Sequence, residues 1–280
     1  MRIFNSGLYI VSTPIGNLDD ITLRSLEVLK NSDIILCEDT RRSLKLLNHY
    51  KIKKKLISYH KFNEQKELQK IIQHLNEGKI LSLISDAGTP TLSDPGLLLI
   101  KTCIEKKIQI YPIPGPSAIT SAVSISGFDE KFIFYGFLPK TENDLVKTIS
   151  RLKDLDFSLV FFIPAIKINF YLNFFKEYFF DRNILIAREM SKLHETFYRE
   201  KISTIKPFKT KIKGELTIVI SKIYTNNKSV SNLEIINQAK KYLKKYSLKD
   251  VVELISKKEK ISKKKVYDIC LKIKNDKKNI

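Results

Sequence analysis

Three short loops rich in glycine and proline contain the residue types best suited to hold a small ligand. They span residues 13–17, 85–96 and 112–117, and each directly follows an apolar run. Glycine lets the backbone approach a ligand closely, and proline fixes the turn before the ligand arrives. The sequence has neither the Walker A pattern nor the dinucleotide-binding fingerprint. The loops therefore predict a binding site, but not one for a nucleoside triphosphate or a dinucleotide.

The middle loop, "SDAGTPTLSDPG", carries two aspartates with different expected roles. Asp86 lies at the end of an apolar run, where its carboxylate could accept hydrogen bonds from an ammonium or a ribose of a ligand. The alternative for Asp86 is a turn or helix cap, the commonest role of Asp after a strand. Asp94 precedes Pro95 and a helical pattern, so we predict that Asp94 caps that helix.

Acidic and basic side chains follow two further apolar runs: Glu38, Asp39, Arg41 and Arg42 after one, and His60, Asn63 and Glu64 after the other. Acids there could take a hydroxyl proton, and arginines suit phosphate. The alternative is a salt-bridged helix start capped by Asp39 or Thr40. His60 is a candidate base or RNA contact, although a lone histidine is commonly structural.

The elements that must position these loops alternate regularly in the first half of the chain. Strands are predicted near residues 8–13, 34–37, 56–59, 80–84 and 108–113. Helices are predicted near 21–30, 41–50, 64–76, 96–106 and 117–126. This alternation indicates a mostly parallel sheet with helices on both faces, which binds ligands at the carboxyl ends of its strands.

The second half predicts another α/β layer and then a small helical module. After an aromatic strand within residues 131–140, strands are expected at 158–163, 184–188, 196–199 and 216–223, and helices at 140–153 and 167–179. A polar linker, 224–232, precedes helices at 233–246, 248–256 and 263–273. The predicted domains are therefore 1–130, 131–224 and 233–280.

The net charge of +20 indicates an anionic partner such as nucleic acid, although a solvated lysine surface is the alternative. Residues 225–280 contain 16 lysines, no arginine and 6 acids. Lys240, Lys241, Lys244 and Lys245 cluster on adjacent turns, and the lysines of 257–265 bracket a turn. As a set, these lysines predict contact with phosphates.

Cysteine and hydropathy patterns exclude several other classes. Cys37, Cys103 and Cys270 are far apart and form no C-x-x-C pair, so neither a disulfide framework nor a metal site is predicted. The longest apolar run, 157–166, is shorter than the ~20 residues of a membrane helix. The first twenty residues do not fit a secretory signal. We therefore expect a soluble cytoplasmic protein.

Several stretches together resemble a known family. They are "LYIVSTPIGNLDDIT", "CEDTRRS", "YHKFNE", "SDAGTPTLSDPG", "PIPGPSAITSAVSISGF" and "FYGFLPK", and in order and spacing they cover residues 8–140. They are similar to the ribosomal RNA small-subunit 2′-O-methyltransferase I family, a branch of the tetrapyrrole methylase superfamily. Weaker matches at "AREMSKLHE" and "KGEL" extend to residue 216, and the tail resembles that family's helix-turn-helix-like appendage.

The resemblance implies two α/β domains of the tetrapyrrole methylase type (a class III methyltransferase) with S-adenosylmethionine in the cleft between them. The implied reaction methylates the ribose 2′-hydroxyl of a decoding-centre cytidine in 16S rRNA of the 30S subunit. A homodimer is implied, with no membrane or DNA partner. The matching cofactor positions are Pro14, Gly16, Asp86, Ala87, Gly88, Thr89, Ser117, Ala118 and Ala187, with Met190 as a further contact. Those for substrate or catalysis are Glu38, Asp39, Arg41 and His60.

Some of these positions also have a purely structural interpretation, and one stretch departs from the family pattern. Ser117 is a natural helix N-cap, and Ala187 suits a core. In "FFIPAIKI", Ile163, Ile166 and Lys167 stand where the family usually has an acid, a histidine and an arginine. Two alternatives therefore stay open: a small-molecule tetrapyrrole or precorrin methylase, and a catalytically weak rRNA-binding assembly protein.

Overall fold

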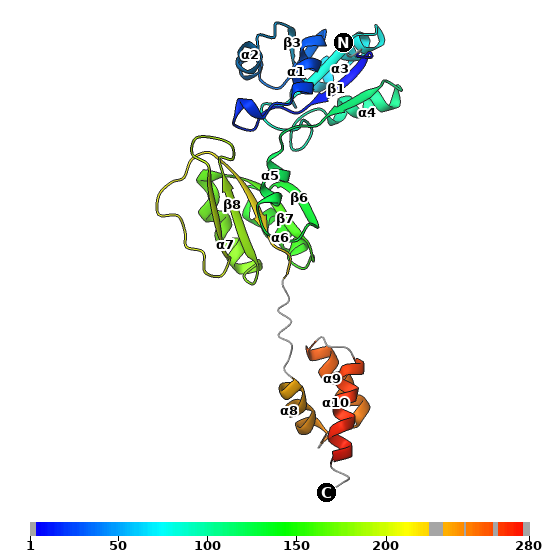
Figure 1. Cartoon of the computed structure of the whole chain (residues 1–280), viewed down its shortest axis with the longest axis vertical. Coiled ribbons are helices and arrows are strands. Elements are labelled where there is room, and N and C mark those ends of the chain that lie inside the picture. Colours follow the sequence, from blue (N-terminus) through cyan, green and yellow to red (C-terminus); the bar gives the residue numbers. More distant parts are fainter. Residues whose placement is uncertain (1–3, 224–231, 244, 260–262, 277–280) are drawn as a thin grey trace. The chain divides into compact units, whose positions relative to one another are not determined.

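The computed structural model describes residues 4–223, 232–243, 245–259 and 263–276. The chain divides into two compact units, Met1–Ile223 and Tyr224–Ile280. The first contains two sheets and the second contains helices (Figure 1). Each unit is described by itself.

The first sheet has the order β3-β2-β4-β1-β5, and all of its neighbouring strands are parallel. Its strands are β1 (Gly7–Val11), β2 (Ile34–Cys37), β3 (Lys55–Ser58), β4 (Ile80–Ile84) and β5 (Ile110–Ile113). The helices along this part of the chain are η1 (Leu18–Asp20), α1 (Leu23–Asn31), α2 (Thr40–His49), α3 (Glu64–Asn76), α4 (Leu97–Glu105) and α5 (Ala118–Ser124). The predicted parallel sheet is therefore confirmed.

Both faces of this sheet are buried, because side chains alternate between two separate apolar clusters. Along β1, Leu8 joins the cluster with Ile71 of α3, whereas Val11 joins the one with Val28 of α1. In a parallel sheet covered on both faces, the sequence of each strand is a nearly continuous apolar run. The carboxyl ends of its strands are consequently the part of the sheet where polar loops can emerge.

The second sheet has the order β6-β7-β10-β8-β9. Its strands are β6 (Phe132–Phe137), β7 (Ser158–Pro164), β8 (Asn183–Arg188), β9 (Thr196–Lys201) and β10 (Glu215–Ile220). β6 and β7 run parallel, and the β7–β10, β10–β8 and β8–β9 pairs are antiparallel. The sheet is accompanied by α6 (Glu142–Leu152), η2 (Ala165–Lys167) and α7 (Ile168–Tyr178).

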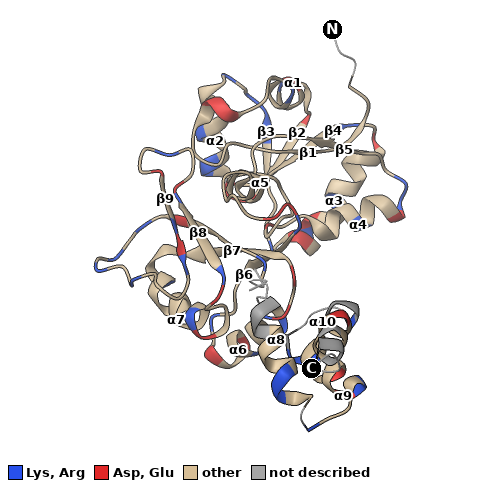
Figure 2. Ribbon diagram, turned by 60° about the horizontal axis from the view of Figure 1, so that its bottom comes forward, with Lys and Arg blue, Asp and Glu red and all other residues tan. Residues whose placement is uncertain are grey.

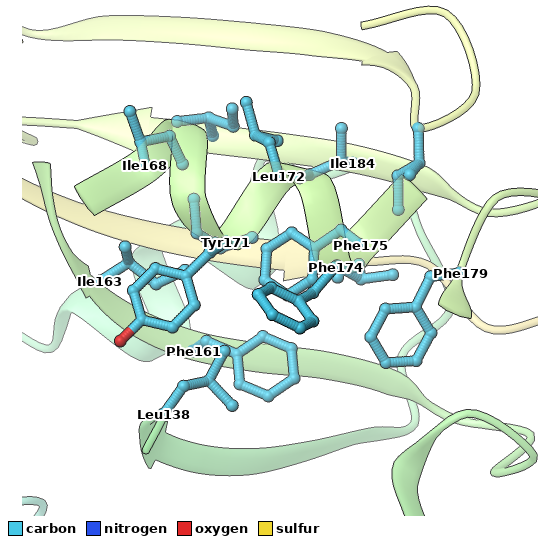
Figure 3. Packing of buried hydrophobic residues seen from close by; sticks show 14 of the residues in the cluster. Leu138, Phe161, Ile163, Ile168, Tyr171, Leu172, Phe174, Phe175, Phe179 and Ile184 are labelled. Carbon is cyan, nitrogen blue, oxygen red and sulfur yellow. The ribbon is translucent and has the colours of Figure 1, made fainter. Parts of the chain in front are cut away.

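One face of the second sheet is covered by α6 and α7. Figure 3 shows aromatic side chains of α7 packed against the strand layer, with the rings of Phe161 and Phe175 stacked 5.9 Å apart. The opposite face packs against α5, the helix that follows the first sheet. Ile119 and Ala122 of α5 are buried with Val160 and Val219 of the second sheet. This packing attaches the first sheet's last loop to the second sheet.

The second unit packs α8 (Asn232–Tyr242), α9 (Leu248–Glu259) and α10 (Lys263–Asp276) around a small apolar core. Ile235, Val251, Ile255 and Val266 are fully buried there. Lysines lie on the exposed surface of the same helices, and α8 and α9 carry blue segments in Figure 2. The predicted linker, apart from Asn232, lies outside the described residues, as does Lys244.

The predicted fold class, two α/β layers followed by a helical module, is confirmed. Across the described part of the chain, none of the helices has both the length and the apolar character needed to cross a membrane.

Candidate active site

The first and second glycine-proline loops are joined by a pair of backbone hydrogen bonds. The N–H of Thr13 donates to the carbonyl of Gly88 (2.9 Å), and the N–H of Gly88 donates back to the carbonyl of Thr13 (3.0 Å). The Thr13 hydroxyl also donates to the carbonyl of Ser85 (3.1 Å). β1 and β4 are parallel neighbours in the sheet, whereas Thr13 and Gly88 form an antiparallel bridge, so the bridge joins the two loops just beyond the strand ends.

Thr89 connects the third loop to the other two. Its hydroxyl lies 3.0 Å from that of Ser12 and donates to the carbonyl of Pro116 (3.3 Å). Gly115 permits this arrangement, because a Cβ there would lie 2.9 Å from the Cβ of Ser12. All three predicted binding loops are thereby held in one rigid cluster at the carboxyl ends of β4, β1 and β5.

Gly88 has a φ of +78°, a conformation that favours glycine. Two nearby residues, Thr91 and Ser93, also have positive φ values of 72° although neither is glycine. Such backbone strain of non-glycine residues clusters at ligand sites and persists only where the surrounding structure enforces it. The loop after β4 is thus a strained segment held in place by its neighbours.

A cavity of about 490 Å³ opens beside this cluster, between the first sheet's loops and the second sheet. From the first half it is lined by Ile15, Glu38, Arg42, Asp86, Ala87, Gly88, Thr89, Leu92, Ser93, Asp94, Ser117, Ala118 and Ile119. From the second it is lined by Phe137, Phe162, Ile163, Pro164, Gly214, Glu215, Leu216 and Thr217. Its size fits a ligand of cofactor dimensions.

Asp86 is fixed at the wall of the cavity by two partners. Its Oδ2 forms an ion pair with Nη1 of Arg42 (3.1 Å), and its Oδ1 accepts a hydrogen bond from the N–H of Asp39 (3.3 Å). Asp86 therefore joins the carboxyl end of β4 to the first turn of α2. Its position at the cavity agrees with the binding role predicted for it.

Asp94 also lines the cavity, and the prediction that it caps the following helix is wrong. Gly96 is the N-cap of α4, and no described side chain caps that helix. Burial and the charges of Glu38 and Asp86 raise the pKa of Asp94 to about 6, although a hydrogen bond to Ser85 partly opposes this. A Pro-Gly pair after Asp94 suggested a cap, but the loop turns the carboxyl toward the cavity instead.

Glu38 is the third carboxyl of the cavity. Burial raises its pKa first and the charge of Asp86 raises it further, whereas His60 and Arg42 oppose the shift. The charge of Asp86 thus raises the pKa of both Glu38 and Asp94, and that of Glu38 further raises the pKa of Asp94, so each holds a proton more readily than an isolated carboxyl does.

Asp39 and Arg41 adopt the capped, salt-bridged helix start that the sequence allowed as their alternative. Asp39 accepts from the N–H of Arg41 (2.9 Å) and pairs with its guanidinium (2.9 Å). These hydrogen bonds from Arg41 lower the pKa of Asp39 to about 2. In the described chain neither residue is among those lining the cavity.

His60 lies half-buried beyond Glu38, in the loop after β3. Its Nδ1 accepts a hydrogen bond from the N–H of Phe62 (3.2 Å). His60 is outside the described residues that line the cavity, and its interaction with Glu38 opposes the raised pKa of that carboxyl.

The predicted cofactor positions divide into lining and supporting residues. Asp86, Ala87, Gly88, Thr89, Ser117 and Ala118 line the cavity. The supporting residues are Pro14, Gly16 and Ala187. Pro14 is buried, and Gly16 lies against Ser191, where an added Cβ would approach the hydroxyl to 2.6 Å. Ser117 occupies the N-cap position of α5, but in the described structure its side chain makes no capping bond.

Ala187 is buried in β8, opposite Thr217 of β10, and it is Thr217 that lines the cavity. Met190 is buried against the same cluster as Ala187 and lines a neighbouring cavity of about 430 Å³. The structural interpretation of Ala187 as core therefore describes its position.

The second sheet supplies cavity residues that the sequence did not single out. Phe162 and Thr217 are register partners on β7 and β10 and share the face that packs against α5. The ring of Phe137 contacts that of Phe162 at an angle of 58°, with ring centres 5.5 Å apart. The apolar run of β7 predicted a strand, but only the pairing of two distant strands reveals this floor.

The stretch that departs from the family pattern has a mixed placement. Ile163 borders the cavity, but its side chain is buried on the other face of the second sheet, among the residues packed against α7 (Figure 3), whereas Ile166 and Lys167 are exposed in η2. The position where the family usually has an acid is therefore part of an apolar core. No group of three or more His, Cys, Asp or Glu among the described residues is arranged to hold a metal ion.

Comparison with known families identifies relatives of this arrangement. The model of the "Tetrapyrrole (Corrin/Porphyrin) Methylases" matches residues 7–206. A protein of Thermotoga maritima named ribosomal RNA small subunit methyltransferase I is 47% identical over 217 residues, covering 76% of this chain and 97% of the relative. One of the same name from Rickettsia prowazekii is 41% identical over 283 residues, covering 97% and 99%. The sequence resemblance is confirmed.

Solved structures share the fold at low sequence identity. A diphthine synthase has a TM-score of 0.61 and 13% identity, covering 76% of this chain and 89% of that one. A uroporphyrin-III C-methyltransferase of Thermus thermophilus, solved with S-adenosylhomocysteine, has a TM-score of 0.56 and 12% identity, covering 77% and 97%. These likenesses support the two-sheet architecture.

Replacing Gly88 with alanine should weaken ligand binding at the cavity. The added Cβ would occupy a left-handed conformation, costing about 1 kcal/mol of stability, and would lie 3.4 Å from Ile15. Gly78→Ala is the matched control, because Gly78 has a φ of +80° and nothing within 4 Å of an added Cβ. Both variants should lose similar stability in thermal unfolding. Only Gly88→Ala should reduce cofactor affinity by calorimetry, and equal affinities would contradict the loop assignment.

Replacing Asp94 with asparagine should stabilise the ligand-free protein at pH 7.5. The folded-state pKa of about 6 exceeds the unfolded value of roughly 3.9. The protonated carboxyl therefore favours folding below about pH 4, and this contribution is lost as the pH rises through 6. Asparagine avoids that loss, so the free energy of unfolding of the variant should be higher by about 1 kcal/mol after allowing for solvent screening.

The measurement is the free energy of unfolding by urea at pH 4 and at pH 7.5. Asp39→Asn is the opposite control: the pKa of Asp39 is lowered, so its replacement should destabilise the protein at pH 7.5. A stability gain for Asp94→Asn that is the same at both pH values would argue against a raised pKa.

Proposed function

We propose, from the premise that the chain belongs to the ribosomal RNA small subunit methyltransferase I family within the tetrapyrrole methylases, that it methylates ribosomal RNA using S-adenosylmethionine. In its finer form, the proposed acceptor is the 2′-hydroxyl of a decoding-centre cytidine in 16S rRNA of the 30S subunit. A homodimer is part of the proposal and is testable by sedimentation.

The observation that carries the proposal is an acidic cavity in a strongly basic protein. The charged residues that line it are Glu38, Asp86, Asp94, Glu215 and Arg42. Arg42 forms an ion pair with Asp86, and Lys192 forms one with Glu215. Glu38 and Asp94 then leave an excess of negative charge at the cavity that favours a cationic ligand, although the whole chain has a net charge of +20. A sulfonium with an ammonium group has this character, whereas a nucleotide phosphate would be repelled.

The lining residues fit S-adenosylmethionine in shape as well as charge. The cofactor supplies, when bound, a methyl group made electrophilic by its attachment to a positive sulfur. Asp86 is fixed by Arg42 and can accept hydrogen bonds from an ammonium or from ribose hydroxyls. Gly88 and Ala118 leave the backbone open to close approach, and Phe162 with Phe137 provides an apolar floor.

Glu38 and Asp94 are the groups best placed to take the proton of an acceptor hydroxyl. A general base works best when its pKa lies near the operating pH. Burial and the negative charge of Asp86 raise the pKa of both carboxyls, and the pKa of Asp94 reaches about 6. Asp39, whose pKa lies near 2, is a weaker base, and its pairing with Arg41 suits it to positioning α2.

Positive groups for the RNA lie at the edge of the cavity and on the second unit. The side chains of Arg41 and Arg42 are 87% and 66% exposed at the start of α2. In the second unit, exposed Lys240, Lys241 and Lys245 offer phosphate contacts whose strength falls with salt. Lys244 and residues 260–262 of the predicted lysine cluster lie outside the described part of the chain.

Transfer of tritium from labelled S-adenosylmethionine tests the proposal directly. We expect label in 30S subunits at one cytidine whose 3′ linkage becomes resistant to alkali, because methylation blocks the 2′-hydroxyl. Label in a porphyrinoid alone would instead support a small-molecule methylase. Cofactor binding without any transfer would support an rRNA-binding assembly protein, and either result would overturn the proposal.

Removing the proposed base should lower the transfer rate more than cofactor affinity. For Glu38→Gln and Asp94→Asn we expect at least a hundredfold loss of kcat, the lower end of general-base contributions. Glu105→Gln, an exposed change at the end of α4, is the control. The wild-type rate should fall below about pH 6 as Asp94 becomes protonated. An unchanged kcat in both variants would exclude these carboxyls as the base.

A further inference from the structure

The most exposed large apolar side chain of the described residues is Phe62, in the loop between β3 and α3. Phe62 is 95% exposed. Exposed apolar residues are common singly, so exposure alone indicates no function. The loop that presents Phe62 is unusual in being rigid, and it lies beside the proposed active site.

Hydrogen bonds fix the backbone on both sides of Phe62. The N–H of His60 donates to Oδ1 of Asn63 (2.8 Å), and Nδ2 of Asn63 donates to the carbonyl of Ser58 (2.9 Å). The N–H groups of Asn63 and Glu64 both donate to the carbonyl of His60 (3.0 Å each). With Phe62 N–H bound to His60, the aromatic ring is held out on a preformed turn.

The turn lies next to the acidic cavity. β3 pairs with β2, and the N–H of Tyr59 donates to the carbonyl of Cys37 (2.8 Å), one residue before Glu38. The rings of His60 and Phe62 meet edge to face with their centres 6.1 Å apart, and His60 in turn interacts with Glu38. His60 thus connects Phe62 to the proposed proton acceptor.

Positive charge surrounds this edge of the first sheet. Lys61 precedes Phe62 and is exposed, and the side chains of Arg41 and Arg42, which pair with Asp39 and Asp86, are exposed in the first turn of α2. An exposed aromatic ring among cations suits an unstacked base flanked by phosphates. Every base has a π face that can stack on the ring, and the phosphates on either side carry negative charge that the cations attract. A second protein copy with the same basic edge would be repelled here.

We infer that Phe62 is a stacking platform for an RNA base at or next to the nucleotide that is methylated. This inference rests on the proposed function and deepens it. Stacking holds the nucleotide outside its helix, so that its ribose can reach Glu38 and Asp94 at the cavity. Phe62 thus contributes to selecting an unpaired nucleotide, and Arg41 and Lys61 hold the phosphates.

The absence of tryptophan from the whole sequence provides a direct test. Phe62→Trp introduces a single indole, and we expect its fluorescence to be quenched when a decoding-region RNA or the 30S subunit is added. Ile104→Trp is the matched control: Ile104 is 63% exposed in the last turn of α4, at the sheet's opposite edge. Its fluorescence should be unchanged by RNA.

Kinetics supply the second readout. Phe62→Ala should raise the KM for 30S subunits by about tenfold or more, with unchanged S-adenosylmethionine affinity. Phe62→Trp, which keeps an aromatic ring, should have the wild-type KM. Ile104→Ala should behave as wild type. An unchanged KM for Phe62→Ala, or an unquenched Phe62→Trp, would overturn the inference.

Two further outcomes are also decisive. Fluorescence of Phe62→Trp that changes with protein concentration in the absence of RNA would assign this surface to a second copy of the chain and overturn the RNA contact. Failure of the wild type to methylate would overturn the proposed function instead. Quenching by RNA does not depend on transfer, so the two failures are distinguishable.

Discussion

The candidate site depends on the pair of hydrogen bonds between the backbones of Thr13 and Gly88. Parallel strands end independently, and the loops that leave β1 and β4 would otherwise be free to move apart. The Thr13–Gly88 pair joins them, and Thr89 extends the connection to the carbonyl of Pro116. Because these bonds order the loops, a ligand entering the cavity has little conformational entropy to remove, which favours affinity.

The same cluster of loops determines how the two sheets meet. The helix after the third loop, α5, covers the second sheet rather than the first, and Ile119 and Ala122 are buried there. Gly16 and Asn17 of the first loop contact Ser191, which follows β8; the N–H of Asn17 donates to its hydroxyl (3.1 Å). Gly136, with a φ of +86°, lets β6 approach Ser93. The cavity is therefore formed between two layers whose separation is set by the loops themselves.

Much of this arrangement could be predicted from the sequence, because it depends on local signals. β2, β4 and α3 lie at the predicted residues, since apolar periodicity and flanking turns define them. The position of Asp86 followed from its place at the end of a buried strand. Asp94 could not be assigned in this way: a cap and a cavity wall have the same local sequence, Asp-Pro-Gly. The placement of Phe162 and Thr217 in the cavity could not be predicted either. It requires the antiparallel pairing of β7 and β10, which are separated by fifty residues of chain.

The distribution of charge accounts for how the proposed reaction accommodates two substrates of opposite charge. A polyanionic RNA and a cationic methyl donor need surfaces of opposite sign within reach of the same hydroxyl. This chain places acids at the carboxyl ends of β2 and β4, and places arginines one turn further along α2. Arg42 belongs to both regions, because its ion pair with Asp86 connects the acidic wall to the basic rim. Phosphates attracted to the rim are repelled by the wall, so the RNA backbone is kept outside while a neutral ribose hydroxyl can enter. Burial, together with the negative charges of Glu38 and Asp86, raises the pKa of Asp94, and those same charges keep the RNA backbone away from the cofactor.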